Sequence, residues 1–181
     1  ADYLKAQGVA ERGVVVGYDN RFAAEDFAAT VAEVMAGNGL RVYLTDRGTP
    51  TPVISFAALH RGAGGAVNLT ASHNPPQDAG FKVRDGSGAA IAPDDLKLIE
   101  ARIGPVDRVT SMPFAQAKRQ GLVEVWDPSE AYIETRIKPS VDLARLKAAG
   151  LKIVVDPMWG VGAGYLPRLI GGGATELIEI Q

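Results

Sequence analysis

The amino-acid sequence predicts an α/β protein. A three-layer α/β/α domain with a mixed, mostly parallel sheet is expected first, followed by the start of a second, similar domain. The continuous apolar run at residues 14–17 is typical of a strand that is buried on both faces, and two largely apolar stretches, at 40–44 and 66–69, are also expected to be strands. Two stretches with helical spacing separate these runs, so the order of elements is βαβαβ. That order implies a parallel sheet with right-handed crossovers.

The helices of the first half have recognisable ends and faces. A short helix within residues 1–12 is expected to close near Gly8. The helix after the first strand should end at Gly37 to Gly39, and its expected buried stripe comprises Phe27, Val31, Val34 and Met35. The next helix should begin with Thr51 as N-cap and Pro52 at N1, and end at Gly62. Its expected core-facing residues are Val53, Phe56, Ala57 and Leu59.

The pattern changes after residue 82. Residues 85–88 are typical of a turn that leads to a return at 89–91, so a hairpin should add antiparallel strands to the sheet. A helix is expected from Pro93, with Leu96, Ile99 and Ile103 on one face, and residues 104–121 are expected to be irregular. A strand at 123–126 and a helix from 127–130 to about Lys138 should follow.

Pro139-Ser140 indicates a domain boundary, which divides the chain into a first domain at 1–140 and an incomplete second domain at 141–181. In the second domain, helices are expected at 143–149 and 165–170, and strands at 151–155 and 176–180. A single βαβ unit of this size is too small to bury a core of its own.

Composition excludes several classes of protein. Lys and Arg number 19 against 21 Asp and Glu, a near-neutral balance that argues against a nucleic-acid or anionic-membrane partner. The absence of cysteine excludes disulfides and thiolate metal sites, and fits a cytoplasmic protein. No apolar run is long enough to span a bilayer. The chain lacks an initial methionine and stops just after a strand-like run, so we expect it to be a fragment of a longer protein.

The loop that follows the third strand carries the chemistry. Its residues include Ser72 and His73, and Lys82 lies at the start of the next strand-like piece. A serine can carry a phosphoryl group covalently, a neighbouring base can activate it, and a lysine can stabilise phosphate oxygens as a point charge. Because the carboxyl ends of parallel strands share one edge of a sheet, Asp19 and Arg21, which follow the first strand, should lie at the same site.

Each candidate residue also has a structural alternative. Ser72 could merely bond backbone in a turn, and His73 could brace that turn instead of moving protons. Lys82 could point into solvent. Asp19 and Arg21 could bind substrate or phosphate, or could form an ion pair that positions the loop and closes the strand-to-helix turn. Two further residues are expected to be structural: Asn74, which caps or bonds within the loop, and His60, which ends a helix.

These motifs resemble those of the alpha-D-phosphohexomutases. Thr70 to Pro75 is similar to the phosphoserine signature of that family, and Gly80-Phe81-Lys82 matches a second element at the expected spacing. Gly17 to Arg21 is similar to the family's Gly-x-Asp-x-Arg element. Thr49 to Pro52 and Asp156 to Gly162 add to the resemblance. Gln77-Asp78-Ala79 departs from the pattern, because family members often carry a tyrosine and an asparagine there.

The resemblance implies a phosphosugar mutase that interconverts hexose 1-phosphate and 6-phosphate, of the glucose/mannose type, through a phosphoserine at Ser72. It implies catalytic roles for Ser72, His73 and Lys82, and substrate-binding or loop-positioning roles for Asp19, Arg21 and Asn74. It also implies Mg²⁺, bound through the phosphate on Ser72 with the remaining ligands beyond residue 181. Glucose 1,6-bisphosphate is the implied activator or intermediate, and the implied partners are a sugar phosphate and the remaining domains of the same chain.

Two other interpretations stay open. The chain could be a non-catalytic module that binds phosphosugars or serves assembly, or it could belong to the phosphoglucosamine mutase branch, although Thr70 fits the glucose/mannose type better. The glycines of residues 160–164 do not have the spacing of a dinucleotide-binding loop, so we expect no nucleotide there. The fragment alone is expected to lack mutase turnover.

Overall fold

A computed structural model describes residues 1–104 and 108–180. These residues form two compact units, Ala1–Pro128 and Ser129–Gln181. The units divide earlier in the chain than the predicted boundary at residue 140, because the helical segment that follows Pro128 groups with the second unit. The assignment of the units to two domains of a larger protein stays a prediction.

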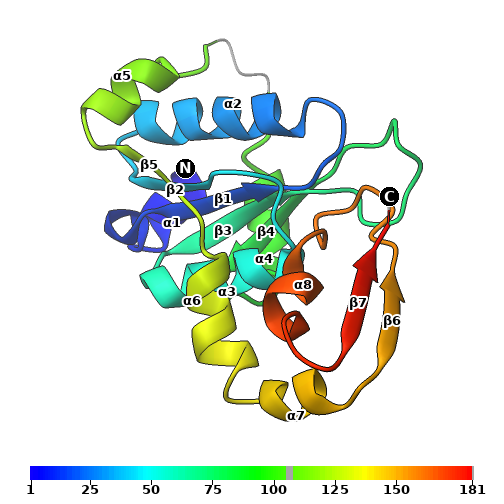
Figure 1. Cartoon of the computed structure of the whole chain (residues 1–181). Coiled ribbons are helices and arrows are strands. Elements are labelled where there is room, and N and C mark those ends of the chain that lie inside the picture. The colour runs from blue at the N-terminus through cyan, green and yellow to red at the C-terminus, as the bar shows by residue number, and fades with distance from the viewer. Residues whose placement is uncertain (105–107, 181) are drawn as a thin grey trace. The chain divides into compact units, whose positions relative to one another are not determined.

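The first unit is built on a five-stranded sheet in the order β4-β3-β1-β2-β5 (Figure 1). The strands β1, β2, β3 and β5 are parallel, and β4 pairs antiparallel with β3. The predicted mixed, mostly parallel sheet is therefore confirmed, with β1 at its centre. The strand bounds are Val14–Tyr18 for β1, Val42–Thr45 for β2, Gly65–Leu69 for β3, Phe81–Asp85 for β4 and Val123–Trp126 for β5.

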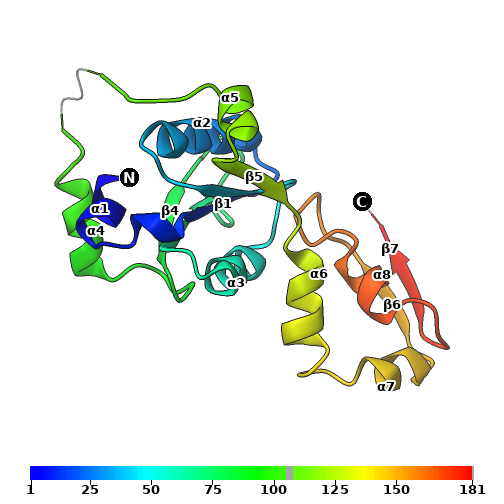
Figure 2. The same ribbon diagram turned by 90° about the vertical axis from the view of Figure 1, so that its left-hand side faces the viewer.

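Helices cover both faces of this sheet. Figure 2 shows α2 (Ala24–Gly37) and α5 (Phe114–Arg119) on one face and α3 (Thr51–Arg61) on the other. Alternate residues of β1 enter the two cores, with Val14 and Val16 on the α2 side and Val15 on the α3 side. The short helices α1 (Asp2–Ala6) and η1 (Ala10–Arg12) precede β1. Among the described residues, no helix is both long enough and apolar enough to cross a membrane.

The buried stripe of α2 differs from the predicted one. Its buried residues are Ala24, Ala28, Ala32 and Ala36, whereas the side chain of Phe27 is 47 % exposed. The alanines and the larger apolar residues both recur at helical spacing, so the pattern alone could not choose between the two faces. Because alanine side chains are small, they let the helix backbone lie close to the sheet. The residues Val31 and Met35 are only partly buried, at the edge of this core.

The start and the outer face of α3 also differ from prediction. The N-cap is Pro50, and no side chain caps the helix, so Thr51 lies inside the first turn. The predicted core residues Val53, Phe56 and Ala57 are buried, but Leu59 is 49 % exposed. The hydroxyl of Thr51 is used elsewhere, because it accepts a hydrogen bond from a buried side chain of β3.

The segment after β4 is simpler than the predicted hairpin. The return at residues 89–91 makes only an isolated bridge, between Arg84 and Ala90, so β4 is the one antiparallel strand that the described residues add. Helix α4 spans Pro93–Glu100 and ends before Ile103, which is 76 % exposed. The stretch predicted to be irregular contains α5, while its residues 105–107 lie outside the described residues.

The second unit contains a βαβ arrangement, as its sequence predicts. Helix α6 (Ser129–Tyr132) continues directly into a π-helical turn, η2 (Ile133–Ile137). Helix α7 (Leu143–Ala148) begins at Asp142, whose carboxylate accepts a hydrogen bond from the Arg145 amide at 2.9 Å. Strands β6 (Lys152–Val155) and β7 (Glu176–Glu179) are parallel, and α8 (Tyr165–Ile170) connects them.

The topology of the first unit identifies where a ligand should bind. From β1 the chain moves to β2 on one side, and from β2 it crosses to β3 on the other side of β1. The carboxyl ends of β1 and β3 therefore flank a switch point in strand order, and parallel α/β sheets bind ligands in the crevice at such a point.

The close contact between α2 and the sheet can be tested at Ala32, which is fully buried. We expect Ala32→Leu to lower the free energy of unfolding by about 1–3 kcal/mol, because the added carbons must displace α2 from the sheet. Urea unfolding followed by circular dichroism measures this. The matched control is Ala115→Leu on the exposed face of α5, for which we expect a change within about 0.5 kcal/mol. Equal stability of the two variants would show that the contact is not tight.

Candidate active site

The loop between β3 and β4, residues 70–80, is called the serine loop here. Its two ends are joined by a hydrogen bond in which the Thr70 amide donates to the Gly80 carbonyl at 3.0 Å. A Cβ at residue 80 would lie 2.5 Å from the Thr70 carbonyl oxygen, so only glycine fits at this close approach. The loop is thus closed at its base and continues the pairing of β3 with β4.

Ser72 has an unusual backbone conformation. Its φ of 56° lies in the left-handed region, which costs a residue with a Cβ roughly 1–2 kcal/mol. Its amide donates a hydrogen bond to the hydroxyl of Thr70 at 3.0 Å. The Ser72 residue itself is exposed to solvent. A strained backbone that presents an exposed side chain is common at functional sites.

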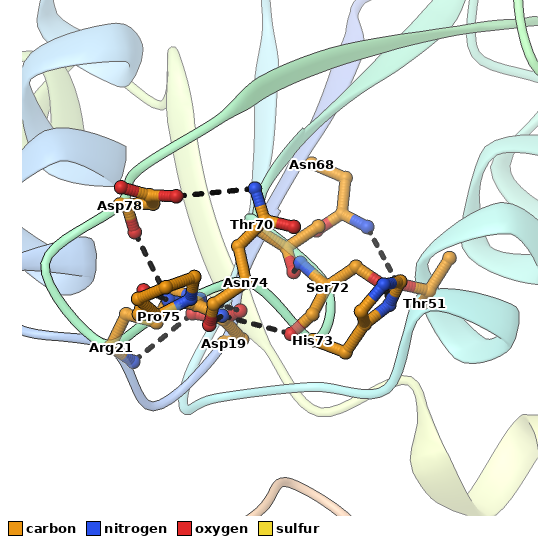
Figure 3. Close-up of polar contacts among 10 residues, drawn as sticks. All are labelled: Asp19, Arg21, Thr51, Asn68, Thr70, Ser72, His73, Asn74, Pro75 and Asp78. Atoms are coloured by element: carbon orange, nitrogen blue, oxygen red, sulfur yellow. Dashed lines mark hydrogen bonds and ion pairs between the residues drawn. The ribbon is translucent and has the colours of Figure 1, made fainter.

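His73 lies directly beside the serine hydroxyl. Its Nδ1 is 3.2 Å from Ser72 Oγ, within hydrogen-bonding distance (Figure 3). An imidazole at this distance can accept a proton from a serine hydroxyl or return one to it. The structure therefore brings together the two residues that the sequence placed side by side, in a geometry that suits proton transfer.

Arg21 binds the backbone of the serine loop. Its Nη1 donates to the carbonyl oxygens of Pro75 at 2.7 Å and Asp78 at 3.1 Å. Its Nη2 donates to those of Ser72 at 2.9 Å and Asn74 at 2.8 Å. The side chain is only 14 % exposed, and Figure 3 shows it reaching under the loop. A planar guanidinium suits this task because its donors diverge in a fixed fork.

Asp19 orients this arginine. One carboxylate oxygen accepts a hydrogen bond from the Arg21 amide at 3.0 Å, and the other lies 3.3 Å from Arg21 Nε. The Asp19 amide donates to the Leu69 carbonyl at 3.1 Å, which joins the end of β1 to the end of β3. Because Nη1 and Nη2 donate to four loop carbonyls, Arg21 has a geometry that favours loop positioning over phosphate binding.

A second polar contact crosses the loop. The Asn74 side chain donates from Nδ2 to Asp78 Oδ2 at 3.2 Å, and the Asn74 amide donates to the Ala71 carbonyl at 3.0 Å. The structure therefore gives Asn74 the within-loop bonds that its sequence position suggested. Asp78 was not a sequence candidate, and its only signal was its departure from the resembled pattern.

Lys82 shares a solvent-open hollow with the serine. The hollow has a volume of about 570 Å³, and its lining includes Ser72, His73 and Lys82. Lys82 is exposed and pairs with Asn68 across the β3–β4 ladder. A cation on the wall of a hollow that also contains a nucleophile can neutralise charge on a bound phosphoryl group.

One buried polar residue of the site could not be found from sequence. Asn68 is 1 % exposed, and its Nδ2 donates to Thr51 Oγ1 at 2.8 Å. This bond joins the end of β3 to the first turn of α3. In sequence, Asn68 is one polar residue within an apolar strand, and nothing there indicates its partner.

His60 stacks against Phe56 and Trp126, with ring centroids 5.0 and 6.2 Å away, which fits the structural role expected for it.

Burial governs the one shifted ionisable group next to these residues. Tyr18 is 6 % exposed, and this burial raises the pKa of its phenol, with smaller contributions from Glu25 and Asp46. The phenol is therefore neutral near pH 7.

Among residues 1–104 and 108–180, no three His, Asp or Glu side chains gather closely enough to hold a metal ion.

Comparison with known proteins identifies the family of the chain. Residues 1–110 match the family model for phosphoglucomutase/phosphomannomutase, alpha/beta/alpha domain I. The chain is 34 % identical over 174 residues to a Haemophilus influenzae protein named "Probable phosphomannomutase", covering 94 % of this chain and 34 % of that protein. It is 31 % identical over 187 residues to a phosphoglucomutase of Staphylococcus epidermidis, covering all of this chain and 34 % of the relative. The chain thus spans about a third of the length of these relatives.

Solved structures show the same fold. The crystal structure of a candidate phosphomannomutase from Thermus thermophilus matches with a TM-score of 0.81 and 38 % sequence identity, over 98 % of this chain and 39 % of that one. The matched family model covers the sheet of β1 to β4 and the serine loop, the segments that carry Asp19, Arg21, Ser72 and Lys82. The chain belongs to the phosphoglucomutase/phosphomannomutase family of phosphohexomutases.

Proposed function

We propose that this chain is the phosphoserine-bearing part of a mutase that interconverts hexose 1-phosphate and hexose 6-phosphate, of the glucose/mannose type. The observation that supports the proposal most directly is the geometry of Ser72. The residue is exposed, its hydroxyl lies 3.2 Å from His73 Nδ1, and Arg21 bonds its loop at four carbonyls. Such a fixed and accessible hydroxyl suits covalent transfer of a phosphoryl group.

In the proposed first step, phosphoserine at residue 72 gives its phosphoryl group to a free hydroxyl of a hexose monophosphate. The bond between Oγ and phosphorus breaks, and a new bond forms between phosphorus and the sugar oxygen. One proton must move from the sugar hydroxyl to Ser72 Oγ, and His73 is placed to deliver it because its Nδ1 lies next to Oγ. The sugar then carries two phosphates, and the serine is free.

In the proposed second step, the sugar bisphosphate reorients and returns its other phosphoryl group to Ser72. The roles of the groups reverse: Ser72 Oγ attacks phosphorus, His73 accepts the serine proton, and the sugar oxygen leaves. Lys82 lines the same hollow and would stabilise charge on the phosphoryl oxygens in both directions. Glucose 1,6-bisphosphate is the expected intermediate and activator.

Magnesium is expected to assist this transfer in the whole enzyme, where it would neutralise charge on the phosphoryl group. Mg²⁺ requires about six oxygen ligands in octahedral geometry. The described residues offer no cluster of carboxylates for it, so the contribution of this chain would be the phosphoryl oxygens on Ser72.

Phosphorylation of Ser72 is the first prediction that follows from the proposed function. Intact-mass spectrometry before and after incubation with glucose 1,6-bisphosphate and magnesium should show a gain of one phosphoryl group, because Ser72 is exposed and His73 can accept its proton. The gain should vanish in Ser72→Ala and persist in Ser111→Ala, an exposed serine that lies against Gly37 of α2.

The same measurement separates the alternatives. A gain only in a longer natural form of the protein would place segments outside residues 1–181 in the transfer step. No gain in either form would reject the mutase proposal in favour of a module that binds phosphosugars without catalysis. Comparison of glucose, mannose and glucosamine phosphates as substrates distinguishes the glucose/mannose type from the phosphoglucosamine branch.

The second prediction concerns turnover. We expect residues 1–181 alone to interconvert glucose 1-phosphate and glucose 6-phosphate no faster than a buffer control, because the chain spans 34 % of its relatives. A coupled assay for glucose 6-phosphate measures this, with a full-length relative as the positive control. Robust turnover by purified residues 1–181 would contradict the prediction.

The third prediction tests the loop-positioning role of Arg21. Arg21→Lys should destabilise the protein by about 2 kcal/mol and should speed amide hydrogen exchange in residues 72–78, because a lysine ammonium cannot reach four carbonyls at once. Exchange elsewhere in the sheet should change little. The matched control is Arg47→Lys, whose side chain is 67 % exposed beside Asp46. Unchanged exchange in the loop of Arg21→Lys would assign Arg21 to another role.

A further inference from the structure

We infer that Thr70 is a positioning residue for phosphoryl transfer, whose hydroxyl holds Ser72 in the left-handed conformation that presents its Oγ. The inference rests on the proposed function and extends it to a residue outside the set that the sequence assigned to the site. Its starting point is that Ser72, which is not glycine, has a φ of 56°. An L-residue keeps such a conformation only where its surroundings impose it.

Both peptide groups of Ser72 are tied. Its amide donates to Thr70 Oγ1 at 3.0 Å, and its carbonyl accepts from Arg21 Nη2 at 2.9 Å. The two bonds fix the backbone on either side of the Ser72 Cα, which leaves the side chain as the only polar part of the residue that faces the hollow.

Thr70 can serve as a fixed anchor because it is itself immobilised. It is 7 % exposed, and it follows directly on β3. Its amide donates to the Gly80 carbonyl at 3.0 Å, and the absence of a Cβ at Gly80 allows the two strands of the loop base to approach. The hydroxyl therefore extends from the closed base of the loop toward the Ser72 amide.

This arrangement has a chemical consequence. The Ser72 amide is occupied by Thr70, so it is not directed at the transferring phosphoryl group. Charge on that group is left to side chains that line the hollow, such as Lys82. The function of the Thr70 hydroxyl is thus geometric: it fixes the direction from which Oγ meets phosphorus. Phosphoryl transfer depends on the in-line placement of the attacking oxygen, so a small loss of alignment is costly.

The test compares Thr70→Val with Thr70→Ser in the longest natural form of the protein. Valine has the shape of threonine without the hydroxyl, whereas serine keeps the hydroxyl. The measured quantity is the rate of phosphoryl gain at residue 72 from glucose 1,6-bisphosphate with magnesium, over a range of bisphosphate concentrations. We expect Thr70→Val to transfer on the order of ten-fold more slowly at saturation, with an unchanged half-saturating concentration, and Thr70→Ser to stay within about two-fold of the unmodified protein.

Amide hydrogen exchange at Ser72 provides a readout that does not depend on activity. Exchange at this amide should be faster in Thr70→Val than in the unmodified protein and unchanged in Thr70→Ser, since only the valine variant lacks the acceptor. Thermal unfolding of each variant checks its folding, and Thr70→Ala replaces Thr70→Val if the valine variant is unfolded at the assay temperature.

The outcomes separate the inference from the function on which it rests. Absence of phosphoryl gain in the unmodified protein overturns the proposed function and the inference with it. Normal gain in the unmodified protein, with an equal rate in a folded Thr70→Val, overturns the inference alone. Equally slow transfer in Thr70→Val and Thr70→Ser would also overturn it, because the hydroxyl would then not be the relevant group.

Discussion

The serine loop depends on one arginine side chain, which is only 14 % exposed. Arg21 donates hydrogen bonds to four carbonyl oxygens of the loop, and Asp19 fixes the arginine from the other side. Backbone carbonyls that turn inward in a loop must find donors, since an unpaired and buried polar group is costly. The arginine supplies those donors from a neighbouring strand end, so the loop can project Ser72 without a regular ladder of its own. The strained conformation of Ser72 is tolerable for the same reason.

The sheet topology makes this contact possible. Residues 19–21 follow β1 and the serine loop follows β3, and these strands are neighbours only because the chain reverses its direction of winding after β2. The two carboxyl ends therefore meet at the switch point, where helices diverge to opposite faces of the sheet. Two small-residue contacts keep the framework tight: alanines between α2 and the sheet, and Gly17 of β1, where a Cβ would lie 2.5 Å from Ile54.

The sequence predicted an element correctly where one pattern of residues is compatible with only one structure. Apolar runs located β1 and β3, alternation located β5, and glycines located the ends of α2 and α3. The prediction was wrong where one pattern of residues is compatible with two different buried faces. In α2 the alanines and the larger apolar residues have the same period, and the larger set was chosen although Phe27 is exposed. It was also wrong for α5, a helix of six residues with too little sequence to show a period.

The sequence by itself determined the class of protein and the residues with reactive groups. The six residues from Thr70 to Pro75, the Gly17–Arg21 element and the order of strands were sufficient to indicate a phosphohexomutase and to place Ser72, His73 and Lys82 in one region. Only the tertiary structure showed which groups Arg21, Thr70 and Asn68 bond. Each of these side chains acts through a hydrogen bond, and the partners of Arg21 and Asn68 are distant in the chain, at residues 72–78 and 51. A hydrogen bond needs an acceptor within about 3 Å and a suitable angle. For residues that are far apart in the sequence, this distance and angle are set only when the chain has folded, so local sequence patterns do not reveal them.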